Sequence, residues 1–307
     1  MKVCFVGLGS IAKRHIRNLK EILDDTVDIT VARRKKNAEI ESPLKDMISH
    51  IISYEDELAE QYDAIFITNP TSLHYETLKK YLRYSNFFFI EKPVFLTGEE
   101  EISAFMKKEK TFYIACPLRY TNVIQYLKDS IDLSLFYSIR CISSSYLPEW
   151  RVGIDYRNTY SAHRDMGGGV CIDLIHEWDY LHYLIGAPIN IKSIIGKKSE
   201  LEIDSDDIAV YIAEYPNKIV ELHLDYFGRK TIRKIELIGK TDTIIADLIE
   251  QKIEWLSERK VIDLSQTRDE YQKLELIHFL NIVGRKCNSD NDLKTACRIL
   301  RIARGGE

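Results

Sequence analysis

The sequence has no excess of positive charge, no long apolar run and no paired cysteines. Lysine and arginine number 43 against 47 acidic residues, so we expect neither a nucleic-acid partner nor a membrane surface. No uninterrupted apolar run could span a bilayer, and the N-terminal residues lack a signal-peptide pattern. The six cysteines are scattered without a CxxC pair, which favours reduced thiols in a cytoplasmic protein over a disulfide framework or a zinc cluster.

The first 117 residues alternate short apolar runs with helical patterns. We expect strands at 2–7, 28–32, 50–52, 63–68, 86–91 and 111–116. We expect helices at 10–24, 43–49, 55–61, 73–83 and 97–108. Strands that are apolar on both faces and alternate with helices predict an α/β unit with a parallel sheet covered on both sides, as in a Rossmann fold.

The pattern changes after Pro117, where strands no longer alternate with helices. Helices are expected at 122–130, 168–185, 268–286 and 292–303. Strands are expected at 137–146, 191–197, 207–215, 218–227, 231–239 and 241–248, with a short hairpin over 252–264. The sequence therefore predicts two domains, residues 1–117 and residues 118–307. The second is an α+β domain with an open, mostly antiparallel sheet.

The segment GLGSIA, residues 7–12, follows the first expected strand and opens a helix. It fits the G-x-G-x-x-G/A pattern, with Gly7, Gly9 and Ala12 in the three small positions and Ser10 and Ile11 in the first helical turn. The first glycine permits a tight turn, and the second lets a diphosphate approach the backbone. The small third residue lets helix and strand pack closely. The pattern predicts a dinucleotide site at the helix N-terminus, against the alternative of an ordinary turn.

The second expected strand ends in two arginines. An NAD site usually places Asp or Glu here for the ribose 2′-hydroxyl, whereas this chain has Arg33 and Arg34. Guanidinium groups suit a 2′-phosphate, so we expect NADP in preference to NAD. The alternative is a solvated basic turn.

Polar residues follow the fourth and fifth strands of the expected parallel sheet. Ligands of such sheets bind at the carboxyl ends of the strands, where TNP and EKP both lie. Pro93 ends the fifth strand and fixes the direction of Lys92. The residues that we assign to the cofactor at these strand ends are Thr68, Asn69, Pro70, His74, Glu91 and Lys92.

The stretch GGGVCIDLIHEWDY, residues 167–180, carries four ionisable residues on an expected helix. Asp173, His176 and Glu177 should share a face, with Asp179 lying round from them. A metal site needs converging ligands, and the spacing of His176 and His182 does not supply them, so we expect no metal. A partly buried amphipathic helix and a proton-transfer site both remain open, because a histidine one turn from a carboxylate titrates near neutral pH.

These motifs, taken in order, resemble the Gfo/Idh/MocA oxidoreductases, named for glucose–fructose oxidoreductase and inositol dehydrogenase. The resemblance covers GLGSIA, TNPTSLH, EKP, Leu118-Arg119-Tyr120 and GGGVCIDLIHEWDYLHYLIG, and it extends to the tail from Tyr271 through His278-Phe279 to Asp292-Leu293. The segment 146–162 further resembles a subgroup linked to surface-polysaccharide and acidic-sugar pathways.

The resemblance implies hydride transfer between a nicotinamide and a carbon of a sugar, polyol or nucleotide-sugar. It implies that Lys92 contacts the reacting hydroxyl and that His176 acts as acid or base beside it. Family members often carry Asp-x-x-x-His, whereas Asp173 and His176 are one position closer, so Asp173 either binds a substrate hydroxyl or orients His176. The open sheet of the family implies a homodimer or homotetramer.

Position in the motif blocks also suggests substrate contacts, because arginines beside aromatic rings suit an anionic sugar or a nucleotide diphosphate. The candidate residues are Arg119, Tyr156, Arg157, Tyr160 and His163. Two alternatives to a sugar dehydrogenase remain on the same fold. One is a dinucleotide-binding regulator or sensor without catalysis, and the other is a reductase of a non-sugar carbonyl or tetrapyrrole-type substrate.

Overall fold

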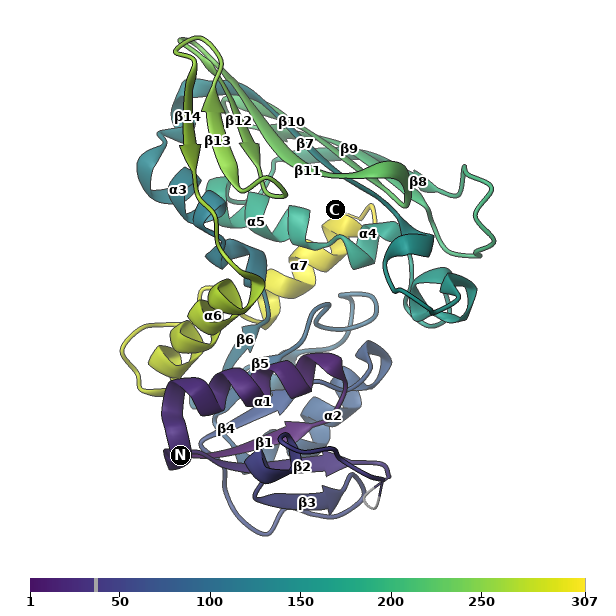
Figure 1. Ribbon diagram of the computed structural model, residues 1–307, viewed down its shortest axis with the longest axis vertical. Helices are drawn as coiled ribbons and strands as arrows, with labels where there is room; N and C mark the ends of the chain where they lie inside the picture. The colour runs from purple at the N-terminus through teal and green to yellow at the C-terminus, as the bar shows by residue number, and fades with distance from the viewer. Residues whose placement is uncertain (36–37, 307) are drawn as a thin grey trace. The chain divides into compact units, whose positions relative to one another are not determined.

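A computed structural model describes residues 1–35 and 38–306 of the chain (Figure 1). Its contacts divide it into two compact units. The first contains Met1–Pro117 and Arg268–Cys297, and the second contains Leu118–Thr267 and the residues from Arg298 onward. The sequence predicted a single domain boundary, at Pro117. The structure also has a division there, but it returns residues 268–297 to the first unit.

The first unit is built on a parallel six-stranded sheet in the order β3-β2-β1-β4-β5-β6. The strands are β1 (Lys2–Val6), β2 (Asp28–Arg33), β3 (His50–Ser53), β4 (Ala64–Ile67), β5 (Phe87–Ile90) and β6 (Thr111–Ile114). β1 and β4 are buried along nearly their whole length, as strands covered on both faces should be. This strand order is that of a Rossmann fold, so the predicted architecture is confirmed.

Aromatic side chains explain why the late helix α6 (Arg268–Val283) belongs to this unit. Phe5, Phe66, Phe89 and Tyr113 are register neighbours on four adjacent strands, and successive rings lie 4.5, 5.1 and 5.6 Å apart. Phe279 of α6 meets the rings of Phe66 and Phe89 edge-on at 5.4 and 5.3 Å. Burial of so much aromatic surface fixes α6 on the sheet face that α1 (Ser10–Leu23) also covers.

Three expected helices of the first unit are wrong. Residues 55–61 form turns, residues 43–49 contain only a short 3₁₀ turn at Lys45–Met47, and residues 97–108 contain only another at Ser103–Phe105. In the last segment the Glu100 carboxylate accepts hydrogen bonds from three successive backbone N–H groups at residues 96–98. A side chain that folds back on the backbone in this way competes with helix formation. The expected helix at 73–83 is present as α2 (His74–Tyr81).

The second unit is an eight-stranded sheet in the order β14-β13-β12-β11-β7-β10-β9-β8. The strands are β7 (Phe136–Tyr146), β8 (Asn190–Gly196), β9 (Ile208–Tyr215), β10 (Lys218–Asp225), β11 (Phe227–Gly239), β12 (Thr243–Asp247), β13 (Lys252–Trp255) and β14 (Lys260–Asp263). Neighbours are antiparallel apart from β7 and β10. The predicted open, mostly antiparallel sheet is therefore confirmed.

Helices lie along one face of this sheet (Figure 1). They include α3 (Asn122–Ser130), α4 (Val170–Asp173) and α5 (His176–Ile185), while α7 (Leu293–Ala303) crosses the division between the units. Trp178 of α5 meets Tyr211 of β9 edge-on at 5.2 Å. Burial alternates along β9 and β10, so their other face is open, with Ile212 53% and Ile219 42% exposed.

The expected single helix over 168–185 is wrong, because it is broken between α4 and α5. Leu174 leaves the helical region with φ −98° and ψ 31°. The start of α4 is held separately, since the carboxylate of Asp206 accepts the N–H of Cys171 and its carbonyl accepts that of Val170. The break means that residues of the two helices do not follow one continuous helical periodicity.

Candidate functional site

The turn after β1 requires its first glycine. Gly7 has a φ of +101°, and its N–H donates to the carbonyl of Ala32 on β2. A β-carbon on Gly7 would lie 2.8 Å from the backbone of Asn69, which follows β4. Any larger residue would therefore push apart the carboxyl ends of β1 and β4.

The N-terminus of α1 is open above this turn. Gly9 caps the helix without a side-chain hydrogen bond, and a β-carbon built on it meets no described atom within 4 Å. Ser10 and Ile11 form the first turn, and Ala12 is fully buried against the sheet. Exposed N–H groups and the positive end of the helix dipole at this point suit the diphosphate of a dinucleotide.

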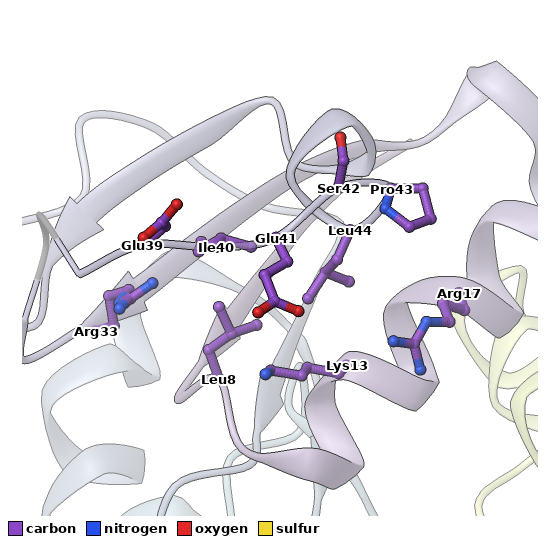
Figure 2. Close-up of a pocket in the computed structure, with 10 residues that line it drawn as sticks. All are labelled: Leu8, Lys13, Arg17, Arg33, Glu39, Ile40, Glu41, Ser42, Pro43 and Leu44. Atoms are coloured by element: carbon purple, nitrogen blue, oxygen red, sulfur yellow. The ribbon is translucent and has the colours of Figure 1, made fainter.

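A cavity of about 360 Å³ opens beside this loop at the end of β2 (Figure 2). Its cationic lining residues are Arg33, Lys13 and Arg17, and its carboxylates are Glu39 and Glu41. Leu8, Ile40, Ser42, Pro43 and Leu44 complete the lining. Arg34, which the sequence paired with Arg33, is exposed and does not line the cavity. Lys13 and Arg17 were not predicted from the sequence, because they lie in α1 and not at the end of a strand.

The residues after β4 support one another. The Thr68 hydroxyl contacts the carbonyls of Val6 and Gly7, both at 3.1 Å, and the Asn69 amide donates to Thr77. Pro70 leads into the turn before α2. These contacts tie the end of β4 to the turn at Gly7.

The side chain of His74 links two loops. Its side chain is 1% exposed; Nε2 lies 2.9 Å from the carbonyl of Asn69, and Nδ1 lies 3.1 Å from the carbonyls of Pro93 and Val94. Burial lowers the pKa of His74 below its ordinary value, although the carbonyl contacts act in the opposite direction. The His74 ring therefore joins the loops after β4 and β5, and its assignment to the cofactor stays a prediction.

Glu91 is likewise engaged by the protein. Its Oε1 lies 2.7 Å from Nε2 of His15 on α1; the histidine side chain is 1% exposed and the glutamate side chain 15%. This contact fixes the segment that carries Lys92, and the assignment of Glu91 to the cofactor stays a prediction. Lys92 itself is half-buried, directly after this anchored residue. His15 was not predicted from the sequence; its signal is a histidine on the buried face of an amphipathic helix.

In the second unit Asp173 is held by tyrosines. The Tyr226 hydroxyl donates to Oδ2 of Asp173 at 2.6 Å, and the carboxylate is 6% exposed. Loss of hydration and the nearby charge of Asp173 both raise the pKa of Tyr160. His176 begins α5 just beyond the helix break and is half-buried. Asp173 and His176 thus lie on either side of the break, with the aspartate fixed in place.

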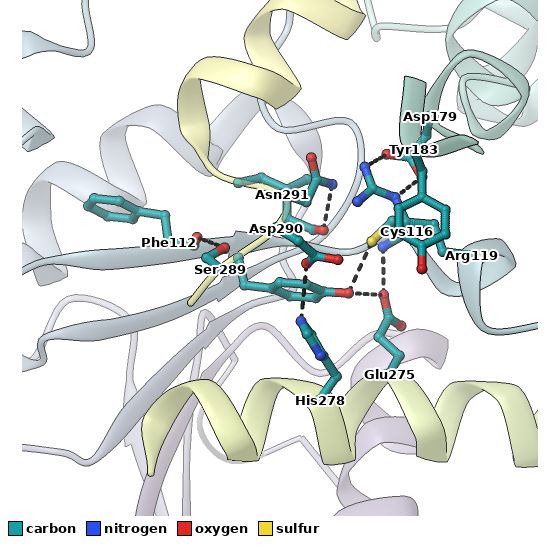
Figure 3. Close-up of polar contacts among 12 residues, drawn as sticks. Phe112, Cys116, Arg119, Asp179, Tyr183, Glu275, His278, Ser289, Asp290 and Asn291 are labelled. Atoms are coloured by element: carbon teal, nitrogen blue, oxygen red, sulfur yellow. Dashed lines mark hydrogen bonds and ion pairs between the residues drawn. The ribbon is translucent and has the colours of Figure 1, made fainter. Parts of the chain in front are cut away.

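The other two acids of this stretch have structural roles. Glu177 is fully buried beside Arg233 of β11, at 2.7 Å. Asp179 forms two 2.8 Å hydrogen bonds with the guanidinium of Arg119 (Figure 3). Arg119 is 1% exposed and also lies over the Tyr183 ring, and its assignment as a substrate contact stays a prediction.

The loop before α4 contains the remaining predicted substrate residues. Arg157 is paired with Asp155 at 2.8 Å and with Glu202 at 3.0 Å. His163 contacts the carbonyl of Arg157 and the carboxylate of Asp204, and the Asp204 contact raises the pKa of His163.

Tyr156 accepts the backbone N–H of Glu202 through its hydroxyl. In this structure Tyr156, Arg157 and His163 therefore mainly hold the loop together. The ring of Tyr160, in contrast, is 40% exposed, and its hydroxyl lies near Asp173.

The glycines before α4 pack against this loop. A β-carbon on Gly168 would lie 2.1 Å from the carbonyl oxygen of Tyr160, and one on Gly169 would lie 2.3 Å from Oδ1 of Asp206. Gly169 also has a φ of +129°. Close approach within the second unit explains these residues.

No cluster of three metal-ligating side chains occurs among residues 1–35 and 38–306. Within the same residues no helix is long and apolar enough to cross a membrane.

Two family descriptions match the chain. Residues 1–114 match an oxidoreductase family with an NAD-binding Rossmann fold, and residues 150–304 match the C-terminal α/β domain of that family. The chain belongs to the Gfo/Idh/MocA oxidoreductase family. The resemblance stated from the motifs is confirmed by these matches.

Curated relatives match only part of the chain. An uncharacterised oxidoreductase of Bacillus subtilis is 26% identical over 60% of this chain and 53% of its own length. One of Streptococcus pneumoniae is 23% identical over 71% and 60% respectively. The chain spans about half the length of the first curated relatives that it matches.

Solved structures share the whole fold at low identity. The UDP-N-acetylglucosamine 3-dehydrogenase of Acidithiobacillus ferrooxidans has a TM-score of 0.79 and 19% identity, covering 99% of this chain and 95% of its own. A levoglucosan dehydrogenase in complex with NADH has a TM-score of 0.83 and 15% identity over the same shares. The WlbA dehydrogenase of Bordetella pertussis, in complex with NADH and UDP-GlcNAcA, has a TM-score of 0.81 and 16% identity, covering 99% and 94%.

Proposed function

We propose that the chain catalyses NAD(P)-dependent hydride transfer to or from a hydroxyl or keto carbon of a sugar, polyol or nucleotide-sugar. The observation that carries this proposal is the open N-terminus of α1 above Gly9, at the same sheet edge as Lys92. The related structures in complex with sugars, nucleotide-sugars and NADH support the substrate class. The nicotinamide, when bound, supplies or accepts the hydride.

For the cofactor we favour NADP over NAD. Arg33 lines the cavity at the end of β2 together with Lys13 and Arg17, and three cations there suit a 2′-phosphate (Figure 2). Glu39 and Glu41 oppose this preference and could instead bind a ribose diol. Replacement Arg33→Gln should weaken NADPH binding about tenfold and leave NADH binding within about twofold.

We propose that Lys92 and His176 handle the proton that is transferred in the reaction. Oxidation of an alcohol removes a hydride from carbon and a proton from oxygen, so a basic side chain must receive the proton at that oxygen. The His15–Glu91 pair anchors the residue before Lys92, and Tyr226 fixes Asp173 three residues before His176. Fixed neighbours of this kind keep acid and base groups in a productive geometry.

For assembly we propose a homodimer or homotetramer through the open sheet face. Ile194, Ile212 and Ile219 lie on the adjacent strands β8, β9 and β10, and each is more than 40% exposed. Contiguous exposed apolar side chains commonly mark protein contacts. A cytoplasmic location also stays a proposal, supported by cysteines that are scattered without a CxxC pair.

The test is turnover by a Lys92→Ala variant on a panel of acidic sugars and nucleotide-sugars. We expect wild-type protein to reduce NADP⁺ with one class of sugar and kcat of the variant to fall at least about a hundredfold, with NADPH binding retained. Lys108→Ala, at an exposed lysine, is the control and should keep full activity. Tight NADPH binding without turnover on any sugar would instead favour a dinucleotide-binding sensor.

A further inference from the structure

One of the three tryptophans is open to solvent. Trp178 and Trp255 are 2% and 8% exposed, as expected of large apolar side chains in a core, whereas Trp150 is 36% exposed. Trp150 lies just after β7 in the second unit. The proposed function gives this exposed indole no role.

Trp150 is held in place at both its backbone and its ring. A short 3₁₀ turn, Leu147–Glu149, precedes it. The N–H of Leu147 donates to the carbonyl of Tyr226 at 2.9 Å, and the N–H of Trp150 donates to the carbonyl of Leu147 at 3.1 Å. The indole Nε1–H donates to the hydroxyl of Ser145 at 2.9 Å. A ring anchored in this way loses little conformational entropy when a ligand binds to it.

The indole lies on the face of the sheet that the helices cover. Ser143 of β7 is 3.4 Å from Nε of Arg233, and the same Nε lies 2.7 Å from the carboxylate of Glu177 on α5. Side chains alternate along a strand, so Ser145, two residues further on, faces the same side as Ser143. Because Ser145 binds the indole, Trp150 is on this side as well.

A single tyrosine ring separates Trp150 from Asp173. The rings of Trp150 and Tyr226 are perpendicular, at 89°, with their centres 5.2 Å apart. The hydroxyl of Tyr226 donates to Oδ2 of Asp173 at 2.6 Å. A perpendicular contact covers at most one face of the indole, which agrees with its 36% exposure. A ligand on the open face of Trp150 would therefore lie beside the end of α4.

A second aromatic side chain adjoins the turn that carries Trp150. The guanidinium carbon of Arg151 is 5.5 Å from the centre of the Tyr160 ring, and Tyr160 is 40% exposed. An apolar platform with hydroxyl and guanidinium groups beside it matches the chemistry of a sugar ring, whose C–H bonds gather on a face while its hydroxyls project from the rim. An open-chain polyol has no such fixed apolar face.

We propose that the Trp150 indole is the stacking platform for the substrate in the second unit, and that the substrate presents the C–H face of a six-membered sugar ring to it. This inference rests on the proposed function. It narrows the proposed substrates to pyranosides and sets open-chain polyols aside.

The test is acrylamide quenching of tryptophan fluorescence in the NADPH-saturated protein. Trp150 dominates the quenching, because the other two indoles are nearly buried. The added compounds are methyl glucoside, methyl glucuronide and UDP-N-acetylglucosamine, each with a pyranose ring, and sorbitol, which has an open chain. None has an aldehyde or keto carbon, so NADPH cannot reduce them during the measurement. We expect at least one pyranoside to lower the quenching constant about twofold and sorbitol to leave it unchanged.

Variants check the stacking itself by calorimetry on the same NADPH-saturated protein. Trp150→Leu should weaken that pyranoside at least about tenfold, and Trp150→Phe should weaken it less, because a phenyl ring keeps part of the stacking surface. Tyr137→Leu is the matched control, since Tyr137 is an aromatic residue, 58% exposed, at the other end of β7. It should bind the pyranoside as wild type does.

The inference is overturned if no pyranoside binds to the wild-type protein, or if one binds without shielding the indole. It is also overturned if sorbitol shields the indole equally well, or if Trp150→Leu binds the pyranoside as tightly as wild type. NADPH binding in the same samples separates these outcomes from failure of the proposed function, in which the wild-type protein binds no nucleotide.

Discussion

Nε2 of His15 lies 2.7 Å from Oε1 of Glu91, in a nearly buried pair that joins α1 to the end of β5. The Gly7–Gly9 turn directly precedes α1, which carries His15, and Lys92 follows Glu91 directly. The pair therefore links the proposed cofactor loop to the proposed proton-transfer residue within one unit.

Removal of the histidine should leave a nearly buried carboxylate without its partner. We expect His15→Ala to lower the free energy of unfolding by about 3 kcal/mol and to reduce kcat, while His15→Gln should restore part of both. Urea titration followed by circular dichroism measures the first effect. His50→Ala is the control, because His50 is 64% exposed and 4.0 Å from Asp28, and should cost less than about 0.5 kcal/mol. Equal losses in the two alanine variants would refute a special role for the pair.

The buried His74 should make stability depend on pH. Burial holds its folded pKa below the ordinary value of 6.5, so the unfolded chain binds the proton more readily. Its contribution is complete above the ordinary pKa and is lost as pH falls towards the folded pKa. The melting temperature of wild type should exceed that of His74→Gln by more at about pH 7.5 than at about pH 5.5. A difference that stays constant between these pH values would contradict the effect.

Gly168 should tolerate no side chain. Its β-carbon would meet three backbone carbonyl oxygens, at 2.1, 2.7 and 2.8 Å, in the turn formed by residues 160–163. We expect Gly168→Ala to cost about 2 kcal/mol or more, measured by chemical denaturation. Gly196→Ala, where a β-carbon meets no described atom within 4 Å, is the matched control and should be nearly neutral. If the two substitutions cost the same, the packing explanation for the glycines before α4 fails.

The parts of the site that were predictable from the sequence depend on local pattern. The turn at Gly7–Gly9 was predictable, because a buried strand, two glycines and a helix follow one another within a few residues. The strand ends at Thr68 and Glu91 were predictable from the apolar runs that precede them. The sheet classes of both units follow from the same periodicities.

The contacts that assign roles are long-range, so the sequence alone could not predict them. His15 and Glu91 are 76 residues apart, Asp173 and Tyr226 are 53 apart, and Arg119 and Asp179 are 60 apart. Each pair depends on which strands and helices become neighbours. Residue type alone does not show that the fold engages Arg119 with Asp179 and His74 with backbone carbonyls.

The most direct test of the account is a fluorescence titration of wild-type and Gly9→Ala protein with NADPH and NADH. A β-carbon on Gly9 meets no described atom, so the variant should melt at the wild-type temperature. That β-carbon would nevertheless occupy the space through which the diphosphate approaches α1. We predict tight binding to wild type, tighter for NADPH, and binding to the variant weakened at least about tenfold. Absence of binding to wild type, or equal affinity in both proteins, would contradict the assignment of the Gly7–Ala12 turn as a dinucleotide site.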